Sequence, residues 1–263
     1  MQVDTMVLNQ AAAFAVELAD RARAIALRYF RAPLELEHKA DLTPVTQADR
    51  EIENELRRMI IQRFPSHGIF GEEMERRESS SRFVWVLDPI DGTRSFITGI
   101  PLFGTLIALA YDGKPVLGVI DIPVTAERWI RVQGQPTIFN GKPCRASGCK
   151  RLREAKLCIT TPDTFVGSYG RRLEALKTSV RWVRYGGDCY IFGMLASGFC
   201  DMVIECGLKP YDFMAVVPIV EGAGGVITDW EGNPLTVDSD GNVIGAATKE
   251  LHAEALRTFS SQA

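Results

Sequence analysis

Residues 83–93 read Phe83-Val84-Trp85-Val86-Leu87-Asp88-Pro89-Ile90-Asp91-Gly92-Thr93 and join a continuous apolar run to two acidic residues. The apolar run predicts a strand that is buried on both faces. Pro89 and Gly92 predict a sharp turn after it, which points Asp91 back toward Asp88. Because α/β sheets place their sites at the carboxyl ends of strands, we expect the two carboxylates to meet at such an end.

Two carboxylates that face each other repel, and the repulsion raises a pKa unless a cation lies between them. Mg²⁺ prefers oxygen ligands and often binds through carboxylates together with a substrate phosphate. The pair Asp88 and Asp91 therefore indicates a divalent metal site. The plainer alternative is that Asp-Pro and Asp-Gly are common turn-forming pairs, which end a strand without binding anything.

The segments around this stretch predict an α/β protein in which helices and strands come in mixed order. Apolar residues at helical spacing cover 5–30 and 46–64, and strand patterns cover 102–111 and 115–122, joined as a hairpin by Asp112-Gly113. Further strands are expected at 129–132, 157–161, 202–205 and 226–228, and further helices at 170–178, 189–199 and 212–222. No repeat or long linker divides the chain, so residues 1–263 are expected to form one unit of two sub-layers, about 1–140 and 141–263.

The composition is that of an ordinary globular protein, with 46% hydrophobic and 24% charged residues. A formal net charge of −3 leaves no basic field, so nucleic acid is not expected as a partner. Residues 1–8 lack a basic segment and argue against a secretory signal, and no apolar run is long enough to predict a membrane span. The six cysteines form no CxxC pair or zinc spacing, which predicts reduced thiols and a cytoplasmic protein.

Other acidic residues have ordinary explanations when each is taken singly. Glu72-Glu73 follows Gly71 and reads as solvated surface. Asp49 and Asp212 each lie at the start of a predicted helix, where an aspartate commonly caps the helix or faces its dipole. None of these residues indicates a site when it is considered alone.

Taken in order along the chain, these segments resemble the inositol monophosphatase family, the lithium-sensitive branch of the sugar-phosphatase superfamily. The resemblance covers nearly the whole chain. It rests on four motifs in the family's order, at 41–49, 71–73, 88–93 and 211–225. It implies a layered α/β/α/β/α sandwich of the type shared with fructose-1,6-bisphosphatase, a homodimer, and Mg²⁺-dependent hydrolysis of a small phosphate monoester.

The resemblance also implies two to three Mg²⁺ ions per subunit and their ligands. Glu72, Asp88 and the backbone carbonyl of Ile90 would hold the first ion. Asp88, Asp91 and Asp212 would hold the second, and a third would lie near Glu72 through water. Two such cations can clamp the attacking and leaving oxygens of a phosphoryl group and acidify bound water.

Catalytic and phosphate-binding roles follow from the same resemblance. Asp49 would pair with the hydroxyl of Thr93, and this dyad would orient and deprotonate the attacking water, with Glu72 beside it. The backbone amides of Gly92 and Thr93 would hold phosphate oxygens, and Asp212 would face the substrate. None of the three histidines lies in a motif, which argues against a phosphohistidine intermediate.

Within the family, the sequence looks most similar to the histidinol-phosphate phosphatase branch, on residues 91–99, 101–109, 186–190 and 207–212. It has Asp188 where inositol enzymes typically have a small uncharged residue. Histidinol phosphate carries an ammonium group, which Asp188 and Glu205 would favour through charge-assisted hydrogen bonds, whereas a neutral polyol would gain less. Asp188 has a structural alternative as the cap of a helix that begins near Cys189.

We therefore expect a histidinol-phosphatase, which converts L-histidinol phosphate and water to L-histidinol and phosphate. The alternatives within the same class are inositol-1-phosphate hydrolysis and a broad sugar-phosphatase activity. A nucleotide 3′-phosphatase would need a basic or aromatic adenine platform, which the sequence does not show. A non-catalytic RNA- or transcription-associated role is opposed by the intact carboxylate set and by the low pI of about 5.7.

Overall fold

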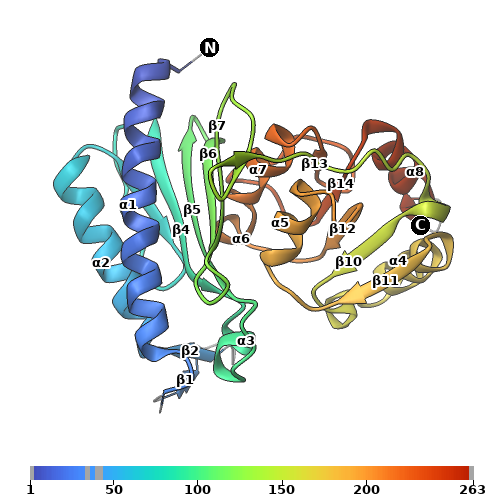
Figure 1. Ribbon diagram of the computed structural model, residues 1–263, viewed down its shortest axis with the longest axis horizontal. Coiled ribbons are helices and arrows are strands. Elements are labelled where there is room, and N and C mark those ends of the chain that lie inside the picture. The colour runs from blue at the N-terminus through green and yellow to red at the C-terminus, as the bar shows by residue number, and fades with distance from the viewer. Residues whose placement is uncertain (1–2, 33–35, 39–43, 261–263) are drawn as a thin grey trace.

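The chain folds into five layers of helix and sheet (Figure 1), in a computed structural model that describes residues 3–32, 36–38 and 44–260. The first layer holds α1 (Thr5–Tyr29) and α2 (Gln47–Arg63). The second is a seven-stranded sheet in the order β3 (Gly68–Gly71), β4 (Phe83–Asp91), β5 (Gly104–Tyr111), β6 (Lys114–Ile122), β7 (Glu127–Val132), β8 (Ile138–Phe139) and β9 (Lys142–Pro143). The third holds α5 (Tyr190–Ala196), α6 (Pro210–Phe213) and α7 (Val216–Gly222).

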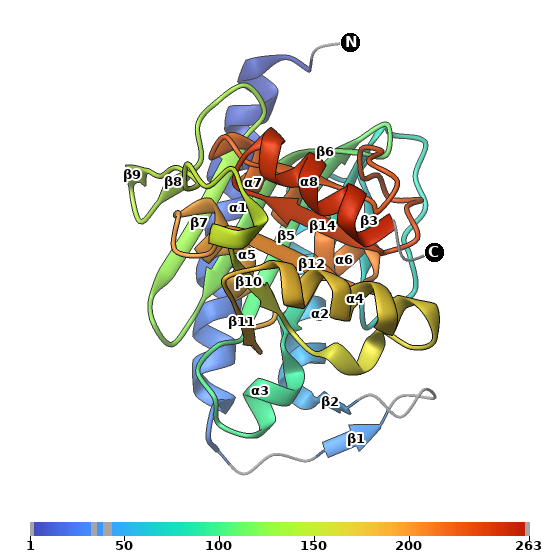
Figure 2. The ribbon, with the colours of Figure 1, turned by 90° about the vertical axis from the view of Figure 1, so that its right-hand side faces the viewer.

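The fourth layer is a five-stranded sheet in the order β11 (Trp182–Tyr185), β10 (Lys156–Ile159), β12 (Met202–Glu205), β14 (Val243–Ala246) and β13 (Val226–Thr228). The fifth holds α4 (Ser168–Ser179) and α8 (Lys249–Ser260), which lie side by side over the outer face of that sheet (Figure 2). Outside the layers lie β1 (Leu36–His38), β2 (Pro44–Thr46), α3 (Thr93–Ile97) and the 3₁₀ turns η1 (Leu152–Glu154) and η2 (Pro162–Thr164). The predicted α/β/α/β/α sandwich is confirmed.

Local sequence explains the two long helices of the first layer. Asp4 caps α1, because its side chain accepts a hydrogen bond from the Met6 amide at 2.8 Å. Apolar residues recur along one side of α1 and are buried against the seven-stranded sheet. The helices predicted at 5–30 and 46–64 are confirmed to within one residue at each end. Neither α1 nor any other helix in the described residues is both long and apolar enough to cross a membrane.

Strand β4 is longer than the predicted strand at 83–87, because its ladder with β5 continues to Asp91. Asp88 pairs with Leu106 and Asp91 with Gly104, so β4 has one residue more than β5 over this interval. Such a bulge bends the strand and redirects the side chains beyond it. The predicted hairpin between β5 and β6 is confirmed, with positive φ angles of 49° and 73° at Asp112 and Gly113.

Predictions for the second half were right in type and less accurate in extent. The strands expected at 157–161, 202–205 and 226–228 are β10, β12 and β13, and the helix expected at 170–178 is α4. The helix expected at 189–199 is shorter, and the one expected at 212–222 is two helices, α6 and α7. This division follows from Pro218, which has no N–H to donate to the carbonyl of Met214. The sequence analysis missed β11, β14 and α8.

The third layer packs tightly enough on the seven-stranded sheet to place its helices accurately. Gly118 on β6 lies under α7, and a Cβ at this position would overlap the carbonyl of Ala215. Buried apolar residues from both sheets and from α5 and α7 complete this layer, among them Ile120, Phe192 and Val220. The motif residue Asp212 lies in α6, immediately before α7, so this packing also fixes Asp212 relative to the end of β4.

Candidate active site and metal centre

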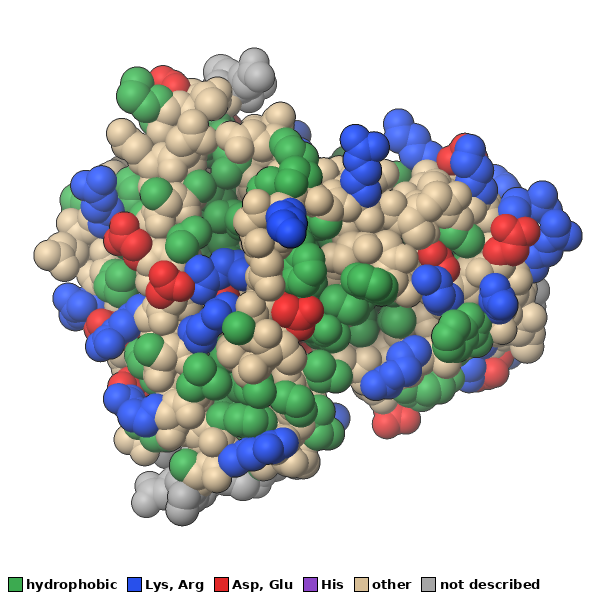
Figure 3. Space-filling model, viewed as in Figure 1, with side chains coloured by type: hydrophobic (Ala, Val, Ile, Leu, Met, Phe, Trp, Pro, Cys, Tyr) green, Lys and Arg blue, Asp and Glu red, His purple; other side chains and the backbone are tan. Residues whose placement is uncertain are grey.

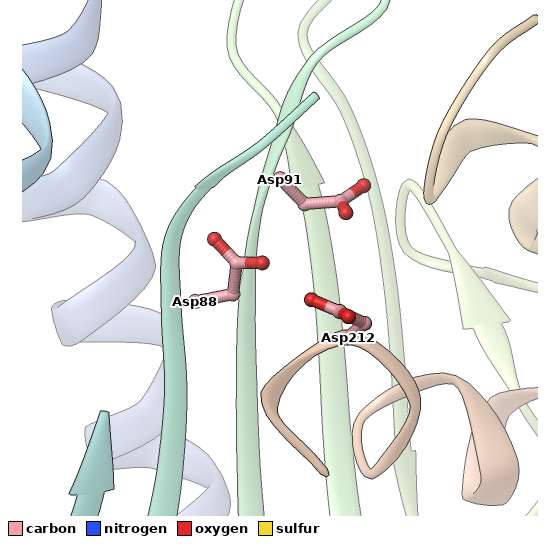
Figure 4. Close-up of side chains that lie close together, drawn as sticks. All are labelled: Asp88, Asp91 and Asp212. Carbon is pink, nitrogen blue, oxygen red and sulfur yellow. The ribbon is translucent and has the colours of Figure 1, made fainter. Parts of the chain in front are cut away.

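Three aspartates from two layers meet at the carboxyl end of β4 (Figure 4). Asp88 and Asp91 lie on either side of the β4 bulge, and Asp212 reaches them from α6. One carboxylate oxygen from each residue lies within 4.8 Å of the others. The structure thus brings together three of the five residues expected as metal ligands, in an arrangement that suits a divalent cation.

Burial raises the pKa of each carboxyl group in this carboxylate cluster. The pKa of Asp88 is raised by burial and then by the neighbouring acidic charges, with Glu72 the first of them. The pKa of Asp91 is raised by burial and by the charge of Asp188, and burial raises the pKa of Asp212 to about 7. Asp88 Oδ1 is buried without a hydrogen-bond partner. Because such an orphaned acceptor is unfavourable in a protein interior, the cluster fits a bound cation.

Glu72 lies at the edge of this cluster, in the loop that follows β3. Its charge contributes to the raised pKa values of Asp49, Asp88 and Asp212, so its carboxylate faces the same region. It lines a cavity, here called the Glu72 cavity, together with Gly92, Thr93, Arg94, Ser95, Thr160, Thr161, Gly186, Gly187, Asp188 and Asp212. Glu72 is outside the group of three that lie within 4.8 Å of one another.

The Asp49 and Thr93 side chains, expected to act as a dyad, are not hydrogen-bonded to each other in this structure. Asp49 Oδ2 accepts from both the amide and the hydroxyl of Thr46, at 2.8 and 2.6 Å, which makes Asp49 part of the capping box of α2. The hydroxyl of Thr93 instead donates to the carbonyl of Ile90 at 3.1 Å. Asp49 Oδ1 stays buried without a partner. Burial raises the pKa of Asp49 to about 6, against the lowering effect of the bonds from Thr46.

Gly92 occupies a position that only glycine adopts easily. Its φ of +84° is left-handed, and a Cβ would lie 2.7 Å from Asp188 Oδ2. Gly92 precedes α3 and lines the Glu72 cavity with Thr93. The proposed binding of phosphate oxygens by the amides of Gly92 and Thr93 stays a prediction.

Asp188 and Glu205 line a second cavity that adjoins the first. This Glu205 cavity is formed by Asp91, Thr160, Thr161, Thr164, Asp188, Cys189, Phe192, Glu205, Cys206, Leu208 and Asp212. Asp188 does not cap α5, as its structural alternative required, because the cap residue is Cys189 and it has no side-chain bond. The carboxylate of Asp188 accepts from the hydroxyl of Ser95 at 2.8 Å instead.

Glu205 ends β12 with an almost fully buried carboxyl group. Its Oε1 accepts a hydrogen bond of 2.6 Å from the amide of Thr160. Burial raises the pKa of Glu205 to about 8, which the bonds from Thr160 oppose and the charges of Asp188 and Asp212 reinforce. Both acidic residues that were expected to contact substrate therefore lie beside the carboxylate cluster.

Several residues of the two cavities were missed by sequence reasoning. Thr160 and Thr161 follow β10, and their place at the carboxyl end of a predicted strand was a usable signal. Arg94 and Ser95 lie in the segment 91–99 that carries the family resemblance, but neither received a role. The amide of Cys189 donates to Asp91 Oδ2, a contact between distant segments that no local pattern indicates.

Comparisons with known proteins agree with this architecture. A match to the inositol monophosphatase family spans residues 7–263. The chain is 45% identical over 261 residues to the chloroplastic bifunctional phosphatase IMPL2 of Arabidopsis thaliana, covering 96% of this chain and 75% of the relative. It is 38% identical over 231 residues to a histidinol-phosphatase of Chlorobaculum parvum, covering 87% of this chain and 89% of the relative.

A solved inositol monophosphatase from Zymomonas mobilis has the same fold, with a TM-score of 0.88 and 46% sequence identity over 96% of this chain and 98% of that one. By sequence and by fold, the chain is a phosphatase that belongs to the inositol monophosphatase family.

Proposed function

We propose that this phosphatase hydrolyses L-histidinol phosphate to L-histidinol and phosphate, with two to three Mg²⁺ ions bound at the carboxylate cluster. The observation that carries the proposal is the pair of acidic side chains, Asp188 and Glu205, beside that cluster. Burial raises the pKa of both groups, because it disfavours their ionised forms. A cationic substrate would stabilise those ionised forms and so offset the cost of burial. A neutral polyol offers no such compensation. The similarity to a protein named histidinol-phosphatase gives further support.

The residues that would hold the metal fit it chemically. Glu72, Asp88, Asp91 and Asp212 would supply hard carboxylate oxygens, and the carbonyl of Ile90 would be a fifth oxygen ligand. The partnerless Asp88 Oδ1 is an acceptor that a cation would satisfy. When bound, Mg²⁺ supplies positive charge and Lewis acidity to the phosphoryl group.

Asp49 and Thr93 are the proposed groups for orienting and deprotonating water. Asp49 has one oxygen engaged by Thr46 and one, Oδ1, available to accept a proton. A pKa near 6 keeps Asp49 largely ionised at neutral pH while making it a better base than an exposed aspartate. Thr93 would take part with its hydroxyl turned away from the carbonyl of Ile90, which it contacts in this structure.

Inositol-1-phosphate is the competing substrate, because the solved relative at 46% identity is an inositol monophosphatase. The two are separated by a panel of phosphate monoesters assayed at one fixed Mg²⁺ concentration. We expect kcat/KM for histidinol phosphate to exceed that for inositol-1-phosphate by at least about tenfold. Equal values, or a preference for the inositol ester, would refute the substrate assignment.

An Asp188→Asn variant tests how the substrate is recognised. Asparagine keeps an acceptor for Ser95 but removes the charge, so KM for histidinol phosphate should rise about tenfold or more. KM for para-nitrophenyl phosphate, which has no ammonium group, should change less than twofold. A Ser95→Ala variant is the matched control, because it removes the hydrogen bond and leaves the carboxylate. Equal effects on the two substrates would contradict a role for Asp188 in binding the amine.

A homodimer and a cytoplasmic location complete the proposal. The edge strand β11 exposes Trp182 at 59%, and nearby Phe199 is exposed at 66%. Lys156 connects the two, since it pairs with Trp182 in the ladder and donates to the Phe199 carbonyl. We place a second copy of the chain on this edge; Trp182→Asp should yield monomers in light scattering.

All six cysteines are free thiols, which supports a reducing compartment.

A further inference from the structure

The loop after β3 carries Glu72 but has no regular secondary structure between residues 72 and 76. Its base is closed by a bridge in which the Ile69 amide donates to the Arg77 carbonyl at 3.1 Å and the Arg77 amide donates to the Ile69 carbonyl at 2.8 Å. This bridge fixes where the loop leaves and rejoins the sheet. It does not fix the tip at residues 73–74, which directly follows Glu72.

Two residues of α2 hold the tip. The carboxylate of Glu53 accepts from the Glu73 amide at 2.7 Å and from Arg57 Nε at 2.7 Å. Arg57 Nη2 donates in turn to the carbonyl of Met74 at 3.1 Å. The two residues that follow Glu72 are therefore hydrogen-bonded to α2, Glu73 through its amide and Met74 through its carbonyl.

Gly71, the residue before Glu72, packs directly against the carboxylate of Glu53. A Cβ built on Gly71 would overlap the Glu53 carboxyl group, with its Oε2 atom only 2.7 Å away. Gly71 has an ordinary backbone conformation, so the absence of a side chain is explained by this close approach alone. Glu72 is thus bracketed on both sides by contacts to Glu53.

The ion pair between Glu53 and Arg57 differs from an ordinary ion pair on a helix surface. An exposed pair of residues four apart contributes little to stability. Here the side chain of Glu53 is fully buried and that of Arg57 is 12% exposed, so each charge depends on the other. Their hydrogen bonds run to each other and to the Glu72 loop.

We infer that Glu53 and Arg57 are positioning residues, which hold the Glu72 loop in place and thereby set the affinity of the site for Mg²⁺. The inference rests on the proposed metal-dependent function and adds two residues outside the ligand set. Groups that orient a metal ligand without touching the metal commonly change its affinity by about 10–100-fold when they are replaced.

The test is a calorimetric titration of metal-stripped protein with Mg²⁺, without substrate. Three variants disturb the contacts of Glu53 and Arg57 in different ways. Glu53→Gln removes the negative charge, and Arg57→Lys keeps the positive charge but loses the two-pronged guanidinium group. Gly71→Ala displaces the Glu53 carboxylate. Glu55→Gln is the matched control, because Glu55 lies on the same helix and binds two arginines away from the loop. The Mg²⁺ dependence of para-nitrophenyl phosphate hydrolysis is measured in parallel.

We expect the Mg²⁺ dissociation constant to rise at least about tenfold in Glu53→Gln and Gly71→Ala, less in Arg57→Lys, and less than twofold in Glu55→Gln. At saturating Mg²⁺ the variants should regain kcat within about threefold, since the ligands themselves remain. Should Glu53→Gln fail to fold, Gly71→Ala and Arg57→Lys decide the matter. Unchanged Mg²⁺ affinity alongside a lower urea midpoint would overturn the inference. If even the unaltered protein bound no Mg²⁺, the metal-dependent function would fail instead.

Discussion

The buried carboxyl group of Glu205 should make the stability of the metal-free protein depend on pH, and Glu205→Gln should remove that dependence. Burial raises the pKa of Glu205 from 4.5 to about 8. At about 1.4 kcal/mol for each pKa unit, this difference corresponds to about 5 kcal/mol. Glutamine retains an acceptor for the Thr160 amide, so the variant loses the charge and keeps the bond.

The sign of the effect follows from where the proton is held more tightly. The folded protein has the higher pKa at Glu205, so this group favours folding most below pH 4.5. Its contribution is lost as the pH rises from 4.5 to about 8 and is constant above that. The variant should therefore match the parent near pH 4.5 and become more stable by about 1.4 kcal/mol per pH unit, up to about 5 kcal/mol above pH 8.

The measurement is urea unfolding in EDTA at half-unit intervals from pH 5 to 9, followed by the fluorescence of the four tryptophans. Glu78→Gln is the control, because that side chain is 77% exposed. Its difference from the parent should stay within about 0.5 kcal/mol at every pH. A Glu205→Gln difference that is constant over this range, or that falls as the pH rises, would show that the burial argument is wrong.

Three further outcomes are expected. Asp88→Asn should abolish the rise in melting temperature that Mg²⁺ gives the parent protein, because a proposed metal ligand is lost. It should also lower kcat by roughly a hundredfold or more. An undiminished thermal shift would contradict the proposed metal site. Chelation by EDTA should remove phosphatase activity and added Mg²⁺ should restore it, whereas activity that persists would exclude the metal mechanism. Gly118→Ala should destabilise the fold by about 1–3 kcal/mol in urea, because its Cβ overlaps the carbonyl that precedes α7. The control Gly148→Ala, whose Cβ meets nothing, should stay within about 0.5 kcal/mol.

Much of the site could be predicted because its strongest signals are local. The apolar run before Asp88 and the turn before Asp91 are contiguous in sequence, so the direction of both carboxylates followed from strand and turn chemistry. The meeting with Asp212 needed the family resemblance, since nothing local relates α6 to β4. Strand β4 itself extended beyond its apolar run, because pairing with β5 continued through the bulge.

What could not be predicted depends on partners distant in sequence. The Thr93 hydroxyl donates to the carbonyl of Ile90 rather than to the expected Asp49, and only the folded geometry decides between these acceptors. Asp188 binds Ser95 across the gap between α5 and α3, which a one-dimensional pattern cannot show. The missed helix α8 is a different case: Leu251, Ala255 and Phe259 recur at helical spacing and were sufficient to predict it.

Helix α2 illustrates how one element can serve folding and chemistry together. Its first turn contains Asp49, which caps the helix through Thr46 and leaves Oδ1 for the proposed catalytic role. One turn later, Glu53 faces the loop of Glu72. Both residues are buried on the side of α2 that also carries Leu56 and Ile60, so the packing of that side holds Asp49 and Glu53 in place.

The carboxylate cluster must lower the stability of the metal-free fold, because three buried acidic groups repel one another there. A cation that binds only the folded state returns stability by mass action, about 2.7 kcal/mol at a hundred times its dissociation constant. Metal affinity and fold stability are consequently linked quantities in this protein. Any residue that positions Glu72, a proposed metal ligand, is therefore expected to influence both. Measurements of stability without control of the Mg²⁺ concentration would mix the two effects.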